Sequence, residues 1–113
     1  AALPLLRIAP DAIVCNAAIS ACEKGRQWRF ALAMFASMDR LRAAPDLFSC
    51  SAIISACGRG RRWPISITLL ADMPEFRVEP TAVTCSAAIS ACEKSGEWSQ
   101  ALELLSRMPR LRE

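Results

Sequence analysis

Apolar residues recur every three or four positions along the chain, a spacing that predicts amphipathic helices. In the first stretch, Val14, Ala18 and Cys22 form an apolar stripe, with Ile13, Ala17, Ala21 and Lys24 on related turns. After a break at residues 24–26, a second stripe is formed by Trp28, Ala31, Leu32, Phe35 and Met38. Gly25 within this break suits a helix C-terminus. No alternating apolar and polar stretch is long enough to predict a strand, so the pattern indicates a hairpin of two helices.

This hairpin pattern occurs three times at a constant spacing of 35 residues. Residues 15–24 read CNAAISACEK, residues 50–59 read CSAIISACGR, and residues 85–94 read CSAAISACEK. The same offset relates Trp28, Trp63 and Trp98, Met38, Met73 and Met108, and Pro10, Pro45 and Pro80. We predict first helices at about 12–24, 47–59 and 82–94, and second helices at about 27–39, 62–73 and 97–108. Pro64 is expected in the first turn of its helix, whereas Pro74 and Pro109 are expected to end theirs.

A single helical hairpin cannot bury its own apolar face, so neighbouring hairpins must stack. The predicted fold is therefore all-α, a right-handed α-solenoid of about three helix-turn-helix repeats. We divide residues 1–113 into the tail of a preceding repeat (1–11), two full repeats (12–46 and 47–81) and a truncated third (82–113). Because three repeats are close to the minimum for stability, we expect a longer parent array or end-to-end self-association.

Composition narrows the chemistry that the chain can support. There is no histidine, the commonest general base and metal ligand, so we expect no catalytic residue, no metal site and no cofactor. The net charge is +3 and 12 of the 14 basic residues are arginines, which permits a nucleic-acid partner without requiring one. No segment approaches the roughly 18 apolar residues of a membrane span, and residues 1–10 do not resemble a signal peptide.

The placement of the six cysteines and three tryptophans suggests a role in core packing and not in disulfides, metal binding or RNA stacking. Cys15 and Cys22 are seven residues apart on one predicted helix, about 10 Å along its axis, too far for a disulfide. With no CxxC pair, zinc spacing is also absent. We expect small, reduced, buried thiols at helix contacts, and tryptophans in the core rather than on an RNA-stacking surface.

The repeat resembles a known family. Residues 12–46, AIVCNAAISACEKGRQWRFALAMFASMDRLRAAPD, are similar to the pentatricopeptide-repeat pattern in several features. These are the Asn in the first helix, the following Ala-Ile, the Lys-Gly break, the Ala-Leu-x-x-Phe-x-x-Met second helix and the closing Pro-Asp. The chain departs from the family at the first cysteine of each repeat, where an aromatic residue is usual, and at the tryptophans, where a smaller residue is usual.

The resemblance implies that each repeat binds one nucleotide of single-stranded RNA. The implied base-reading residues are Asn16 with Asp46, Ser51 with Thr81, Ser86, whose second residue would lie beyond residue 113, and Asp11, which would close an upstream repeat. The implied base-wedging residues are Ile13, Phe48 and Val83. The pair Asn16 and Asp46 matches the family's combination for a pyrimidine, usually uridine, whereas Ser51 with Thr81 is not a standard pair.

Two observations on the residues themselves are compatible with this interpretation. Ile13, Asn16, Ser20 and Glu23 have the spacing of a single helix face. Lys24, Arg59 and Lys94 recur at 35 residues and would contact phosphates. The alternatives are structural: Asn, Ser and Asp near helix starts are good N-caps, and cations near a helix C-terminus are favourable in any protein.

We therefore expect a non-catalytic RNA-binding module from a longer organellar factor for RNA processing, stability or editing, located in a mitochondrion or plastid. Other proteins of an RNA-processing complex are possible partners, and no membrane is expected. The alternative is a protein-binding scaffold similar to tetratricopeptide repeats. An enzyme would need a catalytic domain outside these residues.

Overall fold

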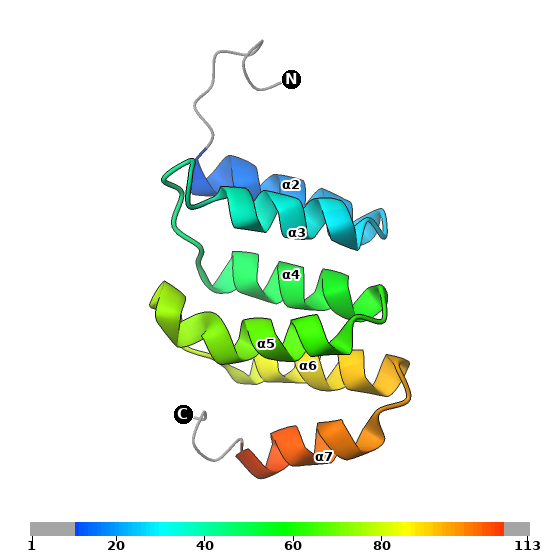
Figure 1. Cartoon of the computed structure of the whole chain (residues 1–113). Coiled ribbons are helices and arrows are strands. Elements are labelled where there is room, and N and C mark those ends of the chain that lie inside the picture. Colours follow the sequence, from blue (N-terminus) through cyan, green and yellow to red (C-terminus); the bar gives the residue numbers. More distant parts are fainter. Residues whose placement is uncertain (1–10, 108–113) are drawn as a thin grey trace.

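The computed structural model describes residues 11–107, which form a stack of helices (Figure 1). The elements are α2 (Ala12–Lys24), α3 (Trp28–Ser37), α4 (Leu47–Arg59), α5 (Trp63–Asp72), a 3-10 helix η1 (Met73–Phe76), α6 (Ala82–Lys94) and α7 (Trp98–Arg107). We call α2, α4 and α6 the A helices, and α3, α5 and α7 the B helices. Within residues 11–107 there is no strand, so the all-α prediction is confirmed.

The A helices begin and end at the predicted residues, whereas the B helices are shorter than predicted. Helix α3 ends at Ser37 and is followed by turns through Arg42. Pro64 lies in the first turn of α5, as predicted. Helix α5 ends at Asp72, just before Pro74 as predicted, and the chain then continues through Pro74 as the 3-10 helix η1. Proline is accepted there because the first turn of a helix needs no N–H donor. Met108, Pro109 and the predicted tail at 1–10 lie outside the described residues.

The helices stack in sequence order to form an elongated body measuring 47 × 26 × 17 Å (Figure 1). Helix α4 is central, because it contacts α2, α3, α5 and α6. The A-to-B turns lie along one edge of the stack and the B-to-A connections along the opposite edge. This is the solenoid that the repeat predicts, with equivalent surfaces presented side by side.

One continuous apolar core runs between the layers. Its largest fully buried side chains include Ile19, Met38, Ile53, Ile54 and Met73. Five of the six cysteines are buried and Cys22 is half-buried, and all six are free thiols. Thiols are small, which allows the helices to approach closely, so their predicted packing role is confirmed. A buried hydroxyl joins the two helices of the second hairpin, where Ser66 Oγ donates to the Ile54 carbonyl at 3.0 Å.

The A helices end in Schellman motifs, with the residue after the C-cap in the left-handed region. In α2 the Gln27 N–H donates to the Cys22 carbonyl at 2.8 Å and Arg26 has φ 60°. The equivalent left-handed residues are Arg61 and Gly96. Gly25 is the C-cap as expected, but with φ −85° it does not supply the left-handed turn. Arginine carries that conformation in two of the three repeats.

The tryptophans differ from repeat to repeat. Trp28 and Trp63 are half-buried and pack against the core. Trp98 is 71% exposed, so the expectation that it lies in the core was wrong. The difference is positional: Trp28 lies against the C-terminal end of the next A helix, at Gly60, whereas no A helix follows α7 among the described residues.

Candidate nucleic-acid interface

Asn16 and Asp46, which are 30 residues apart, meet at the junction of the first and second repeats. Asn16 Nδ2 donates to both Asp46 carboxylate oxygens, at 3.2 and 3.4 Å. Asn16 lies within α2 and Asp46 immediately precedes α4, so stacking of the A helices creates the contact. Asn16 Oδ1 is buried and accepts no hydrogen bond from the described residues. The amide is therefore oriented by Asp46 through its nitrogen, and its oxygen is the group left without a partner among the described residues.

Asp46 also caps α4. Its carboxylate accepts from the Ser49 N–H at 2.9 Å, and Ser49 Oγ accepts from the Asp46 N–H at 2.7 Å, which completes a capping box. Burial by itself would raise the pKa of Asp46, but the hydrogen bonds from Ser49, Asn16 and the Phe48 N–H outweigh it and lower the pKa. Asp46 is thus an anion at neutral pH and can only accept hydrogen bonds.

The other predicted second readers are N-caps as well. Asp11 accepts from the Val14 N–H at 3.0 Å at the start of α2. Thr81 accepts from the Val83 N–H at 3.2 Å and forms a capping box with Thr84 at the start of α6. The structural alternative considered from sequence is therefore correct for this position of the repeat. Asn16, by contrast, lies inside its helix and does not cap it.

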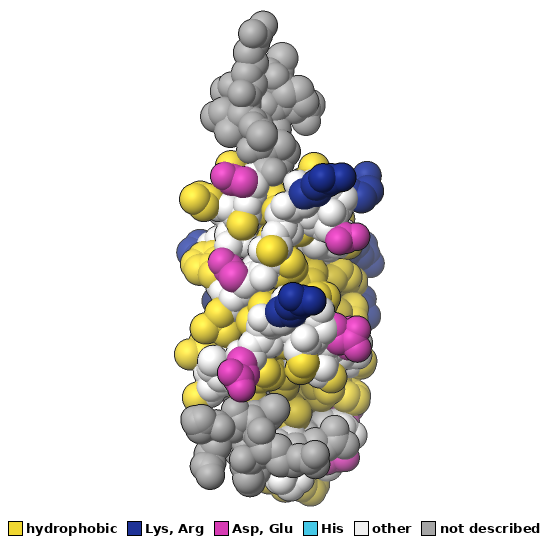
Figure 2. Space-filling view, turned by 90° about the vertical axis from the view of Figure 1, so that its left-hand side faces the viewer, with side chains coloured by type: hydrophobic (Ala, Val, Ile, Leu, Met, Phe, Trp, Pro, Cys, Tyr) yellow, Lys and Arg dark blue, Asp and Glu magenta, His cyan; other side chains and the backbone are white. Residues whose placement is uncertain are grey.

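Three apolar side chains at the beginnings of the A helices face solvent. Ile13 is 77% exposed, Phe48 is 56% exposed and Val83 is 63% exposed, so core packing does not explain their apolar character. These are the residues predicted to wedge against bases. Figure 2, which views the side of the stack where the A helices begin, shows hydrophobic side chains exposed among charged ones. Repeated apolar side chains on an otherwise polar face offer surfaces for flat rings.

A groove of about 340 Å³ crosses the A helices, with lining residues from α2, α4 and α6. Phe48 and Val83 line it together with the predicted reader Ser51, while Lys24 contributes a cation and Glu23 an acid. The structure thus brings two of the predicted wedging residues and one predicted reading residue around a single space. Ser51 is half-buried there, whereas Ser86, the equivalent residue of α6, is exposed. No hydrogen bond joins Ser51 to Thr81 among the described residues, unlike Asn16 and Asp46.

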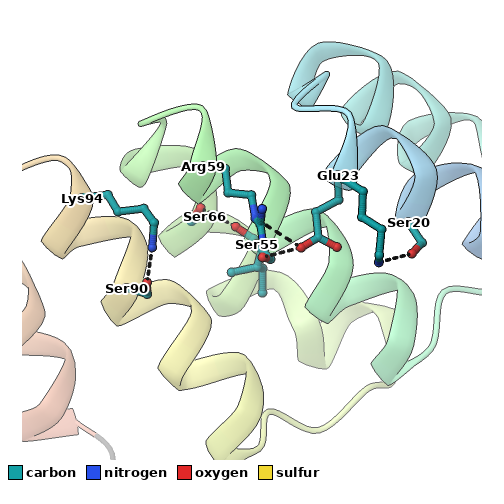
Figure 3. Close-up of polar contacts among 9 residues, drawn as sticks. Ser20, Glu23, Ser55, Arg59, Ser66, Ser90 and Lys94 are labelled. Carbon is teal, nitrogen blue, oxygen red and sulfur yellow. Dashed lines mark hydrogen bonds and ion pairs between the residues drawn. The ribbon is translucent and has the colours of Figure 1, made fainter.

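The three recurring cations at the ends of the A helices are not equivalent (Figure 3). Lys24 donates to Ser20 Oγ at 3.1 Å and Lys94 donates to Ser90 Oγ at 2.8 Å, and both lysines are exposed. Arg59 instead pairs with Glu23 at 3.5 Å across the first junction. Its charge is partly balanced, so of the three predicted phosphate contacts Arg59 is the most restrained.

Sequence reasoning missed two further cations, Arg26 and Arg61. They line a second cleft at the A-to-B turns, next to Arg59 and Lys94. Their 35-residue spacing was visible, but the third repeat has Gly96 at this position, which interrupts the pattern. A comparison of residues 26 and 61 alone would have indicated a basic pair near the predicted phosphate contacts.

Metal and membrane chemistry receive no support from the described part of the chain. In residues 11–107, no three potential ligands among Cys, Asp and Glu are grouped so that they could hold a metal ion. Over the same residues, no helix combines the length and apolar character needed to cross a bilayer. Burial raises the pKa of Cys50 and Cys57 to about 11, so these thiols stay protonated at neutral pH.

Comparisons with known proteins agree with this geometry. A family model described as "PPR repeat" matches residues 48–78 and 83–112, and one described as "Pentatricopeptide repeat domain" matches residues 6–60. No curated protein matches the chain. The fold is similar, with a TM-score of 0.80, to the crystal structure of the pentatricopeptide repeat protein PPR10 in complex with an 18-nt psaJ RNA element. The two chains are 29% identical, over 88% of this chain and 15% of the other. This chain therefore belongs to the pentatricopeptide repeat family.

Proposed function

We propose that this chain binds single-stranded RNA along the face formed by its A helices, with one nucleotide assigned to each repeat and no catalysis of its own. The hydrogen bond between Asn16 and Asp46 is the observation that supports this most. It fixes an amide donor beside a carboxylate acceptor on an open face of the molecule. The similarity to a repeat protein crystallised with RNA adds to this support.

Under this proposal, Asn16 and Asp46 read a pyrimidine, with uridine preferred. Uracil presents a ring N–H donor next to a carbonyl acceptor. An amide nitrogen has two N–H groups, so Asn16 can donate to the carbonyl, and the Asp46 carboxylate can accept from the ring N–H. Cytosine lacks that ring N–H, so it satisfies the carboxylate through its exocyclic amine instead. Ile13 and Phe48 would lie against the two faces of this base.

The remaining predicted contacts form a second reading position. A base in the groove between Phe48 and Val83 would meet Ser51, with Thr81 as second reader, while Ser86 and Asp11 would belong to incomplete positions. Lys24, Arg59 and Lys94 would contact phosphates. We further propose that the parent protein acts in RNA processing, stability or editing in a mitochondrion or plastid, with other proteins as partners, and that its repeats divide at residues 12–46, 47–81 and 82–113.

Fluorescence anisotropy tests the RNA proposal. Labelled RNA and DNA oligonucleotides of U, C, A and G would be titrated at two salt concentrations, with tandem fusions of the chain to raise affinity. We expect RNA binding that favours U. The logarithm of the association constant should fall by roughly 0.7 per contacted phosphate for each tenfold rise in salt concentration. Asn16→Ala should remove the preference for U, whereas Gln100→Ala, which deletes an amide from helix α7, should not. Folded tandem proteins that bind none of the strands would favour the protein-scaffold alternative.

End-to-end association is a separate proposal that concerns helix α7. Trp98 and Leu102 are 71% and 54% exposed there, whereas the equivalent Trp28 lies against the next A helix. We propose that a second copy of the chain supplies that surface through its α2, where Ala17 and Ala21 are exposed. Sedimentation equilibrium should show reversible association that Trp98→Gln abolishes. A monomer at all concentrations would reject it.

A further inference from the structure

A cleft of about 630 Å³ lies between the C-terminal ends of α4 and α6. Four of the residues that line it are cations: Arg26, Arg59, Arg61 and Lys94. Ser55 and Ser90 add hydroxyl groups, and none of the described residues lining the cleft is an acid. Glu23 partly balances Arg59 alone, and the other three like charges around this space repel one another, so the arrangement is most favourable when an anion occupies it.

The second junction has no carboxylate at the position where the first junction has Glu23. At the first junction Glu23 accepts from Ser55 Oγ at 2.8 Å and pairs with Arg59, which places a carboxylate between the repeats (Figure 3). The equivalent position of the second repeat is Gly58. A Cβ at Gly58 would stand 2.9 Å from the Ala91 Cβ, so glycine is required for the close approach of α6. Ser90 consequently meets no carboxylate and accepts from Lys94 instead.

Arg26 and Arg61 enter the cleft from the turns that follow α2 and α4. Both have φ 60°, a conformation that costs a non-glycine residue about 1 kcal/mol or more. Among the described residues neither arginine is paired with an acid. The third repeat carries Gly96 at this position, with φ 76°, which shows that the turn itself does not need arginine.

We propose that this cleft is a phosphate-binding site. Guanidinium groups match phosphate oxygens in geometry, and the Ser90 hydroxyl, which accepts from Lys94, can donate to the same oxygens. Ser55 and Ala87 line both the cleft and the groove that holds Phe48, Ser51 and Val83, so the two spaces adjoin. A base in the groove would therefore bring its own phosphate to the cleft. This assignment rests on the proposed RNA binding for the source of the phosphate, which is either an internal diester of the strand or its terminal phosphate.

The test compares two double variants of equal net charge. Arg26→Gly with Arg61→Gly removes two cations from the cleft. Arg42→Gly with Arg77→Gly removes two arginines of the same backbone conformation, with φ 59° and 63°, from the opposite edge of the stack. Glycine suits all four positions, so both proteins should fold. Tandem fusions of each would be titrated with U-containing RNA that carries either a 5′-phosphate or a 5′-hydroxyl.

We expect the cleft variant to bind RNA roughly 10-fold more weakly or worse, the scale of losing one charged hydrogen bond, and the control variant to lose much less. A loss seen only with 5′-phosphorylated RNA would assign the terminal phosphate, and an equal loss with both strands would assign an internal one. Equal affinities for the two variants would overturn the proposal. If the unsubstituted chain binds no RNA, titrating it with inorganic pyrophosphate tests the phosphate site directly. Saturable amide shifts at Gly58 and Ser90 that the cleft variant lacks would uphold the site, and their absence from the parent would reject it.

Discussion

The indole of Trp28 lies where a side chain at Gly60 would otherwise stand. A Cβ at Gly60 would overlap the ring, with Cγ of the indole only 2.7 Å away. The guanidinium groups of Arg62 and Arg29 lie 4.9 and 5.3 Å from the ring centroid, so the indole is enclosed by the glycine and two cations. This contact joins the B helix of the first repeat to the A helix of the second.

Gly60→Ala should therefore destabilise the chain by roughly 1–3 kcal/mol, because the indole must leave its position. Gly25→Ala is the matched control: it occupies the same C-cap position, and a Cβ there would meet its nearest atom, the Ala21 carbonyl oxygen, at 3.4 Å. It should be neutral or slightly stabilising. Urea denaturation of both variants measures the difference, and equal free energies of unfolding would contradict the role assigned to the indole.

Arg42→Gly should stabilise the chain by about 1 kcal/mol, because it relieves a left-handed conformation at the end of the first repeat. Arg29→Gly removes the same charge from the first turn of α3 and should destabilise the chain, since glycine loses more conformational entropy on folding and cannot contact the Trp28 ring. Thermal unfolding of the two variants should thus show shifts of opposite sign. Destabilisation by Arg42→Gly would contradict the left-handed turn.

The sequence predicts a helix boundary well where a characteristic residue, such as an N-cap residue or a glycine, marks it. The A helices were predicted to the residue because Asp11, Asp46 and Thr81 are recognisable N-caps and the repeat fixes the rest. The B helices end in turns that use Arg42 and Arg77 where glycine is the usual signal, so their ends were misplaced. For the interface, the contact of Asn16 with Asp46 followed from the family resemblance, not from the spacing alone.

The basic cleft was not predicted, because it depends on a carboxylate that the second repeat lacks. Gly58 stands where the other repeats carry Glu23 and Glu93, and the effect of a missing carboxylate appears only when α6 is placed against α4. The exposure of Trp98 was missed for a related reason. Trp28 lies against the next A helix at Gly60, whereas Trp98 is exposed in the described residues, and the 35-residue pattern assigns both positions the same environment.

The stability of the chain should fall as the pH rises from about 9 to 11. Cys50 and Cys57 have a pKa of about 11 in the folded state against 9.0 when unfolded, so the unfolded thiols ionise first. The stabilisation that the two protonated thiols add to the free energy of unfolding is complete below pH 9 and is lost as the pH approaches 11. Each thiol adds a slope of up to about 1.4 kcal/mol per pH unit to the free energy of unfolding. Urea unfolding of Cys57→Ala should show a shallower fall than the parent protein, and identical slopes would reject this assignment.

Asp46→Ala should lower the free energy of unfolding by about 1 kcal/mol, because α4 loses its N-cap, whereas Asp46→Asn keeps a capping oxygen and should cost less. The folded pKa of Asp46 lies below 3.8, so the benefit of its charge is present above that pH and is lost as the pH falls through the folded value. Denaturation of the parent and Asp46→Asn at pH 7 and pH 3 should show their difference shrinking at the lower pH. A difference that persists at pH 3 would contradict the charged cap.

Asp46 belongs to two repeats at once, since it starts α4 and holds Asn16 of α2. Under the proposed RNA binding, a residue that reads a base at this position must therefore also be able to start a helix, as Asp11 and Thr81 do at their own junctions. Only a few residue types, chiefly Asp, Asn, Ser and Thr, meet that second demand well. Helix formation therefore limits the residue types that this position can hold, whether or not RNA is bound. Under the proposed RNA binding, a substitution there would change the stability of the next repeat as well as the base preference.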